Sequence, residues 1–310
     1  MIRPITLEDQ GLFERFFNDE FDRNNYGNNW AYIMQACRGS GGLGHKYYDG
    51  KNLIGVGRHN SHYVLVRPLG KDIVPTVQRL ARQLSSDSQR PVYVKHLLSG
   101  DSEKLLSEGF KDMREYPWDP RWPKDDDTHP QVILTLSDLF DGGVQGLGRR
   151  GIRQSLERFV RSLSAGQLDS YYLDSYDPTV KTGQDKQVIS FIREWAKGSD
   201  ELVQPYANIS SHPPNKGYSY VMHLDGQIVG FYVFGIIGVD SVGFHTGISR
   251  HWKDHPSLAE ANWYRVFEEI FQRGVREVNL GGSEEISLHK FKLKFRPHRL
   301  NEAHHLVYIP

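Results

Sequence analysis

Cysteine is almost absent from this chain of 310 residues, which contains only Cys37. A lone cysteine excludes an internal disulfide framework and is typical of a reducing compartment, and we expect Cys37 to be a small core residue. No stretch reaches the roughly 18 to 20 apolar residues needed to cross a bilayer, and the N-terminus lacks the apolar segment of a signal peptide. These absences predict a soluble, cytoplasmic protein.

An excess of charge is missing as well. The 38 basic and 38 acidic residues cancel, and the sequence pI is about 7.3. A balanced chain does not coat nucleic acid by its overall charge, so any anion binding has to be local. No group of histidine, cysteine and aspartate has the spacing of a zinc site, and we therefore predict no metal.

What the sequence does contain is a mixture of helical and strand patterns. Short β-branched runs alternate with amphipathic helical patterns from the beginning, which favours an α/β (α+β) chain. The glycine-rich segment Asp141–Gly151 has no hydrophobic cluster. It predicts a boundary near residue 140, with one domain at residues 1–140 and another at residues 141–310.

The pattern of apolar residues indicates where most elements lie. The clearest hairpin joins Tyr218–Leu224 to Gln227–Phe234 through Asp225-Gly226, a dipeptide that suits the positive φ angles of a two-residue turn. A helix is expected around Trp263 and a strand around Val278. Further strands are expected at Asn52–Gly57, Ser61–Val66, Pro91–Leu97, Val132–Leu136 and Asp240–Ile248.

A glycine pair and a basic, aromatic run follow the strand at Val278. Gly281-Gly282-Ser283 comes first, and Phe291-Lys-Leu-Lys-Phe-Arg-Pro297 comes a few residues later. If the second segment is extended, Lys292 and Lys294 share one face, which can hold an anion while the aromatic face packs into the core. The alternative is a solvated edge strand on which lysine discourages pairing.

Several of these segments resemble a known family. The order of elements is similar to the GNAT acyltransferase fold, Asp225–Gly235 resembles its central hairpin, and Ser102–Lys111 resembles its closing segment. The remaining matches are Val132–Phe140, Gly146–Arg153, Asn279–Ser283 and Phe291–Pro297. Together they resemble the tandem-GNAT proteins related to the C-terminal domain of phosphatidylglycerol lysyltransferase. The resemblance implies two GNAT-like domains, each a mixed central sheet flanked by helices, with the active site in the second.

The resemblance also implies a reaction. Members of that family and the related Fem aminoacyltransferases generally take an aminoacyl group from aminoacyl-tRNA. We therefore expect an enzyme with no tightly bound cofactor that uses aminoacyl-tRNA as donor and a soluble small molecule or peptide as acceptor. Two alternatives remain open: an N-acyltransferase that uses acyl-coenzyme A, and a non-catalytic protein that binds a metabolite or peptide.

Basic residues are the expected contacts of the tRNA end. By resemblance, Lys292 and Lys294 meet its phosphates. Arg149, Arg150 and Arg153 open a helix after a glycine-rich turn, where free amides favour an anion, or else they are an ordinary charged helix face. Gln145-Gly-Leu-Gly148 is a degraded form of the Q-x-x-G-x-G/A pyrophosphate loop of coenzyme A users, and no such pattern follows Phe234, which counts against coenzyme A.

Four residues are candidates for the reacting groups. Gly282 and Ser283 can present amides to a developing oxyanion, or Gly281 and Gly282 can simply make a turn that needs glycine. Glu284 follows them and is able to orient a cationic amine, or else Glu284 and Glu285 mark the N-terminus of a helix. His245 is a candidate general base or a polar core residue, and Asp240 lies on the opposite face of the same expected strand.

Aromatic residues alternate along the expected hairpin. Tyr218, Tyr220, Tyr232 and Phe234 are candidates to line a pocket for an aminoacyl side chain or the terminal adenine. An apolar core is the other interpretation of such a stripe.

Overall fold

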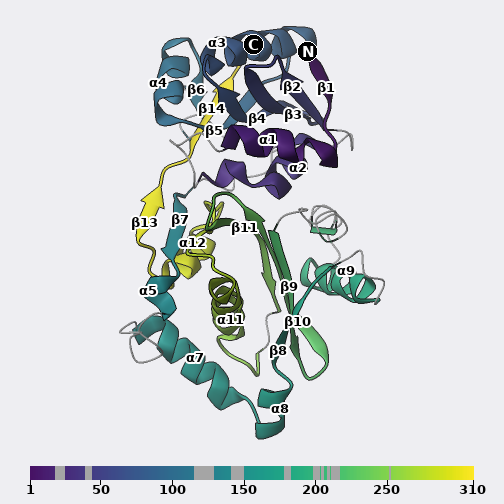
Figure 1. Ribbon diagram of the computed structural model, residues 1–310, viewed down its shortest axis with the longest axis vertical. Coiled ribbons are helices and arrows are strands. Elements are labelled where there is room, and N and C mark those ends of the chain that lie inside the picture. The colour runs from purple at the N-terminus through teal and green to yellow at the C-terminus, as the bar shows by residue number, and fades with distance from the viewer. Residues whose placement is uncertain are drawn as a thin grey trace. The chain divides into compact units, whose positions relative to one another are not determined.

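The computed structural model describes residues 1–17, 25–38, 44–114, 129–140, 150–177, 183–197, 203, 206–207, 210, 217–250 and 253–310. It forms two compact units. The first unit comprises Met1–Gln131, Gly281–His289 and Leu300–Pro310, and the second comprises Val132–Leu280 and Lys290–Arg299. Two mixed sheets of seven strands are present, and helices flank them (Figure 1), so the expected fold class is confirmed.

The first sheet includes a strand from near the end of the sequence. Its order is β1 (Ile2–Pro4), β2 (His45–Tyr48), β3 (Asn52–Arg58), β4 (Tyr63–Gly70), β5 (Val92–Leu97), β14 (His304–Tyr308) and β6 (Lys111–Asp112). Strands β4 and β5 are parallel, and β14 is antiparallel to both of its neighbours. The sheet of the first unit is therefore completed by residues that follow β6 by about 190 positions.

Helices cover both faces of the first sheet because its strands alternate their side chains between two cores. One face carries η1 (Leu7–Asp9), α1 (Gln10–Phe17), η2 (Tyr26–Asn28) and α2 (Trp30–Arg38), and the other carries α3 (Ile73–Ser88) and α4 (Ser99–Ser107). Leu53 belongs to the first core and its neighbour Ile54 to the second. Cys37 is fully buried in the first core, as expected, and burial raises the pKa of its thiol.

The second sheet contains the predicted hairpin. Its order is β13 (Arg299–Asn301), β7 (Gln131–Thr135), β12 (Glu277–Asn279), β11 (Ser241–Ser249), β10 (Gln227–Ile236), β9 (Gly217–Leu224) and β8 (Tyr172–Ser175). Asp225 and Gly226 join β9 to β10 with φ angles of 52° and 72°, which confirms the expected turn. Strands β11 and β12 are parallel.

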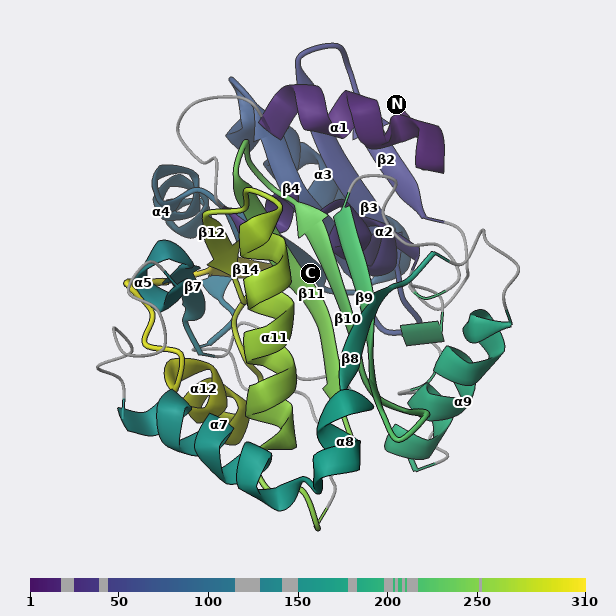
Figure 2. The same ribbon diagram turned by 60° about the horizontal axis from the view of Figure 1, so that its bottom comes forward.

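Helices also cover both faces of the second sheet. Figure 2 shows α11 (Leu258–Gln272) lying along β11 on one face and α9 (Gln184–Trp195) on the other. The structure also describes the helices α5 (Ser137–Phe140), α7 (Arg150–Ser162), α8 (Ala165–Asp169) and α12 (Ile286–Leu293). The largest core of the protein lies between β7, β9 to β12, α7 and α11.

The division into units differs from the expected boundary at residue 140. Val132–Leu136, assigned from sequence to the first domain, contributes β7 to the second sheet, where Val278 pairs with Leu134. At the other end of the chain, β14 belongs to the first sheet. The contacts therefore change units after Gln131, and Leu300–Pro310 returns to the first unit because Leu306 and Val307 are buried there.

Candidate functional site

The basic, aromatic run is not extended, so the condition under which Lys292 and Lys294 would share a strand face is not met. Phe291–Leu293 forms the end of α12, and Lys294 and Phe295 follow in the turn after it. Lys292 therefore lies in the last turn of α12, and Lys294 lies just beyond the end of the helix. The apolar half of the prediction is confirmed, because Phe291, Leu293 and Phe295 pack into the largest core.

The two lysines have different surroundings. Lys292 is 5% exposed. The Lys294 ammonium donates to Glu260 Oε1 at 2.7 Å, and its side chain remains 48% exposed. Only Lys294 thus presents its charge to solvent, beside a carboxylate, and phosphate contact by either lysine stays a prediction.

The helical form is explained by an aromatic cluster around Trp263, which we define as Phe244, Trp263, Phe267, Phe291 and Phe295. The Trp263 ring lies 4.3 Å from Phe244 and 5.0 Å from Phe291, and it stacks on Phe295 at 5.7 Å between centroids. Phe291 and Phe295 are one helical turn apart and lie 5.8 Å from each other. A helix brings both rings to Trp263, whereas a strand would space them by about 13 Å.

The glycine pair ends the strand β12 within a tight turn of the first unit. Gly281 has φ 67°, so the expectation of a turn that requires glycine is confirmed at this position. A Cβ on Gly281 would lie 3.0 Å from Tyr26 Cε2. Backbone conformation and close packing both select glycine here.

Substitution of Gly281 by alanine should therefore destabilise the first unit by roughly 1–2 kcal/mol, since the positive φ and the Tyr26 contact both oppose a side chain. Gly100→Ala is the matched control: this glycine lies in α4, where an added Cβ would meet no atom within 4 Å, and the substitution should be neutral or stabilise by up to about 1 kcal/mol. Urea denaturation compares the two. Equal midpoints would contradict the steric account.

Ser283 is buried next to two stacked histidines. It is 0% exposed, and its carbonyl accepts from the backbone N–H of His129 at 2.9 Å. The His129 and His289 rings stack at 5.2 Å between centroids. Among the described residues, the Ser283 hydroxyl has no hydrogen-bond partner. Glu284 follows it, half-buried, two residues before α12. The catalytic roles of Gly282, Ser283 and Glu284 stay predictions.

His245 lies where the parallel pair of the second sheet ends. Strand β12 pairs with β11 only as far as Gly243, and His245 is the extra residue of a bulge between Phe244 and Thr246. Bulges redirect side chains and are frequent near active sites. Asp240 is exposed in the turn before β11, so the structure does not bring the two residues together.

Burial lowers the pKa of His245 from 6.5 to about 4. The imidazole of the folded protein is therefore neutral at pH 7, as a general base requires. The unfolded chain takes up the proton near pH 6.5 and the folded chain only near pH 4. Stability is thus fully present above pH 6.5 and is lost as the pH falls from 6.5 to 4.

We expect this histidine to cost about 3 kcal/mol of stability between pH 6.5 and pH 4, from about 1.4 kcal/mol per pKa unit. His245→Gln should flatten the profile by that amount, whereas His45→Gln on β2 is the control for loss of a half-buried imidazole. Denaturation by urea at several pH values measures both. Parallel profiles for His245→Gln and the parent would contradict the assignment.

Of the three arginines proposed to bind an anion, the structure describes the side chain of one. Arg149 lies outside the described residues, and Arg150 begins α7 with a side chain that also lies outside them. Arg153 is 46% exposed and pairs with Glu157 at 3.4 Å, one helical turn away. That pair favours the charged helix face for Arg153, and anion binding by the three arginines stays a prediction.

The alternating aromatics of the hairpin lie in the core. Tyr220 is 2% exposed, and Tyr232 and Phe234 are fully buried. Tyr232 shares a hydrogen bond of 2.5 Å with the Ser249 hydroxyl. Burial raises the pKa of both tyrosines. These positions match the interpretation as an apolar core, and a role in substrate binding stays a prediction.

A polar cluster in the first unit was missed by the sequence analysis. Arg67 and His96 follow the last matched pair of the parallel strands β4 and β5, and they are 2% and 1% exposed. Their φ angles are 49° and 58°, a conformation that costs about 1–3 kcal/mol for residues with a side chain. The only signal in the sequence was a histidine and an arginine among β-branched residues.

The buried arginine ties this cluster together. Arg67 Nε donates to Asn28 Oδ1 at 2.8 Å, and Nη1 donates to the carbonyl of His96 at 3.2 Å. The His96 ring contacts Tyr32 and His305 edge to face, at 4.8 Å and 4.7 Å between centroids. The carboxyl ends of parallel strands are a frequent place for ligand sites, and here the end is built from buried polar groups.

Comparison with known proteins gives no match to a family model or to a curated protein sequence. Solved structures do match. L-PGS from Bacillus licheniformis is 15% identical and has a TM-score of 0.62, with 97% of this chain and 90% of that chain covered. The FemX structure is 10% identical with a TM-score of 0.59, covering 100% and 97%.

A third matching structure is a tandem GNAT protein from the clavulanic acid biosynthesis pathway. It is 13% identical and has a TM-score of 0.51, with 100% of this chain and 98% of that chain covered. The chain has a tandem GNAT-like fold. At these identities the likeness establishes the fold, and the tandem GNAT-like architecture extends over nearly the whole of each matched chain. None of the described helices is long and apolar enough to span a membrane.

Proposed function

We propose that this tandem GNAT-like protein is an aminoacyltransferase that moves an amino acid from aminoacyl-tRNA to an amine or hydroxyl of a soluble small molecule or peptide. Two arguments support the proposal. The sequence resembles a family whose members generally use aminoacyl-tRNA, and the fold matches L-PGS and FemX over nearly their full chains.

The observation that carries the choice of donor is the connection between β11 and α11. Coenzyme A users bind pyrophosphate on a glycine-containing loop at the start of a helix, where backbone amides are free. The segment after Phe234, where such a loop was expected, connects β10 to β11, and the helix begins only at Leu258. Residues 250–257 read Arg-His-Trp-Lys-Asp-His-Pro-Ser and contain no glycine. This composition disfavours coenzyme A in the second unit.

One feature of the first unit favours the coenzyme A alternative. Arg67-Pro-Leu-Gly70-Lys-Asp72 comprises the last four residues of β4 and the two residues before α3, and it keeps half of the glycine pattern. However, Gly70 still pairs with Asn52 in the sheet, and a Cβ there would lie 2.3 Å from Asn52 Oδ1. Asp72 puts a carboxylate where the pattern has a small residue. The segment is therefore better explained by strand packing than by pyrophosphate binding.

The proposed reaction needs little covalent help from the protein. The acceptor nitrogen or oxygen attacks the ester carbonyl, a bond to the amino acid forms, the bond to the ribose oxygen breaks, and the acceptor's proton passes to a base. Because the ester is already activated, orientation and charge stabilisation supply most of the acceleration. In this proposal His245 is the neutral base.

The test is incubation of the protein with a mixture of radiolabelled aminoacyl-tRNAs and candidate amine acceptors. The proposal expects a labelled product that resists ribonuclease and disappears when the tRNA is deacylated first. The control arm offers acetyl-coenzyme A without tRNA. Turnover in the control arm alone would establish the coenzyme A alternative, and silence in both arms would favour a non-catalytic binding protein.

Lys294 provides a more local test, because its ammonium is the exposed member of the lysine pair. Lys294→Ala should weaken tRNA binding and reduce the slope of log K against log salt by about 0.7–0.9 for one lost phosphate contact. Adding Lys292→Ala should reduce the slope again if both lysines meet phosphates. Arg265→Ala is the matched control, as Arg265 is 46% exposed on α11 and pairs with Glu268. An unchanged slope would assign Lys294 to its contact with Glu260.

A further inference from the structure

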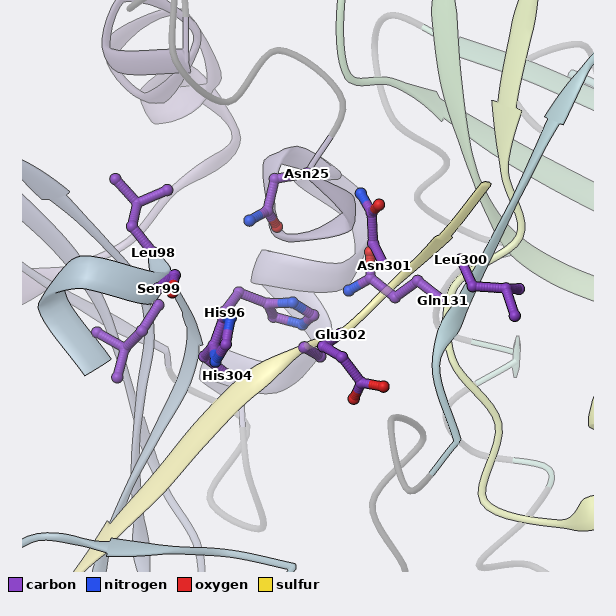
Figure 3. Close-up of a pocket in the computed structure, with 11 residues that line it drawn as sticks. Asn25, His96, Leu98, Ser99, Gln131, Leu300, Asn301, Glu302 and His304 are labelled. Atoms are coloured by element: carbon purple, nitrogen blue, oxygen red, sulfur yellow. The ribbon is translucent and has the colours of Figure 1, made fainter. Parts of the chain in front are cut away.

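The first unit contains a pocket of about 260 Å³ at the carboxyl end of β5. Its walls come from the residue before η2, the β5–α4 connection, the start of β7 and the segment that leads into β14. Figure 3 shows Leu98 and Ser99 on one side of the pocket and Asn301 and Gln131 on the other. This volume suits a ligand the size of an amino acid or dipeptide, below the range usual for drug-sized molecules.

The lining is polar but carries little charge. Three residues with carboxamides, Asn25, Gln131 and Asn301, line it, together with Ser99, His96 and His304. Among the described residues that line the pocket, Glu302 alone has a formal charge at pH 7, and none of them is a lysine or arginine. Phosphate-bearing ligands favour arginine or lysine, so this set disfavours them. Carboxamides offer both donors and acceptors, which match the C=O and N–H of peptide groups.

The wall beside β5 is held in a fixed geometry. The Asn25 carbonyl oxygen accepts from the Gly27 N–H at 2.7 Å, which orients its amide. Gly27 packs against the cluster so closely that a Cβ would lie 2.6 Å from His96 Cβ and 2.7 Å from Arg67 Cδ. The hydrogen bonds of Arg67 to Asn28 and to the His96 carbonyl hold η2 against the same strand end. Because buried hydrogen bonds already fix this wall, little conformational entropy is lost when a ligand binds to it.

The opposite wall supplies the negative charge. Glu302 Oε2 accepts from Arg114 Nη1 at 2.8 Å, and Arg114 also pairs with Asp112 at 3.0 Å. Two carboxylates therefore share one guanidinium, and the group keeps a net charge of −1. Glu302 remains 57% exposed, so it is accessible to a cation at the rim. Burial lowers the pKa of His304, which leaves its ring neutral near pH 7 and adds no positive charge.

We propose that this pocket binds a short peptide, or an amino acid amide, that has a free amino group. The carboxamides of Asn301, Gln131 and Asn25 hydrogen-bond the peptide group, and Glu302 attracts the ammonium group. The site lies wholly within the first unit and goes beyond the proposed function, because binding here requires neither tRNA nor transfer.

The test is ligand-observed NMR and calorimetry on the full chain, with glycylglycine as the probe. N-acetylglycylglycine is the matched probe without the amine, and inorganic phosphate and glucose represent other ligand classes. We expect glycylglycine to bind, acetylation to weaken binding at least tenfold, and phosphate and glucose not to compete. Absence of dipeptide binding, or tighter binding of phosphate or glucose, would overturn the proposal.

Two variants locate the site. Glu302→Gln should weaken glycylglycine about tenfold while leaving the acetylated probe unchanged, and Asn301→Ala should weaken both probes. Glu8→Gln, an exposed glutamate in η1, is the control. Circular dichroism checks that each variant is folded. If loss of the ion pair with Arg114 unfolds the Glu302→Gln variant, the Asn301→Ala variant still tests the site. Unchanged affinity in the folded variants would place glycylglycine elsewhere and overturn the assignment. Because transfer is assayed separately, either proposal is able to fail alone.

Discussion

Deletion of His304–Pro310 should unfold the first unit. The deletion removes β14 from between β5 and β6, and with it Leu306 and Val307, which are 1% and 0% exposed. Burial of two such side chains contributes about 3–6 kcal/mol, and a typical domain has only about 5–15 kcal/mol of stability. The deletion also leaves the hydrogen-bonding edge of β5 unpaired, which favours aggregation.

Removal of Pro310 alone is the control, since this residue is exposed and follows the last strand. Hydrogen exchange resolved by peptide is the measurement, because it reports β3, β4 and β5 separately from the second unit. We expect loss of protection in the first sheet after the longer deletion and none after the shorter one. Full protection in both proteins would mean that β14 adds little to the sheet.

Replacement of Trp263 by alanine should destabilise the second unit by about 3–5 kcal/mol. Trp263 is 3% exposed and contacts Phe244, Phe291 and Phe295 at the centre of the aromatic cluster. Its removal leaves a cavity that these rings cannot fill by small shifts, because each ring is held by other contacts as well. The loss should appear as a lower urea midpoint.

Trp195→Ala is the matched control for this substitution. The Trp195 side chain is 37% exposed at the end of α9 and contacts the Tyr206 ring at 5.3 Å between centroids. We expect a loss of about 1 kcal/mol or less there, in line with the remaining exposure. Similar losses for both tryptophans would contradict the central position of Trp263.

The sequence was informative wherever local chemistry decides the structure. Asp225-Gly226 specified the β9–β10 turn because few residues other than glycine and aspartate tolerate its φ angles. The stripe around Trp263 specified α11, and the short run around Val278 specified β12. In each case the local sequence pattern is compatible with only one type of secondary structure.

The alternating pattern at Phe291, Leu293 and Phe295 is compatible with both a strand and a helix. Strict alternation suits a strand, yet the same residues place two rings one helical turn apart. The choice is made by Trp263 on α11, which is distant in sequence and collects both rings. A tertiary contact therefore decided the local structure, and the proposed site at the lysines changed with it.

The pocket of the first unit could not be predicted from local sequence patterns either, because its lining residues are far apart in the sequence. Asn25, His96 and His304 come from three separate parts of the sequence and meet only because β14 pairs with β5. Nothing near residue 304 indicates which strand will be its neighbour. Which strand pairs with β14 depends on the packing of side chains across the whole sheet and not on the sequence of β14 alone.

The late position of β14 has a consequence for synthesis on the ribosome. About 190 residues are made between β6 and β14. At roughly 5–20 residues per second, the first sheet waits about 10–40 seconds for its missing strand. During this time the nascent chain exposes the unpaired edge of β5, so a chaperone that shields extended segments should be needed until β14 has left the exit tunnel.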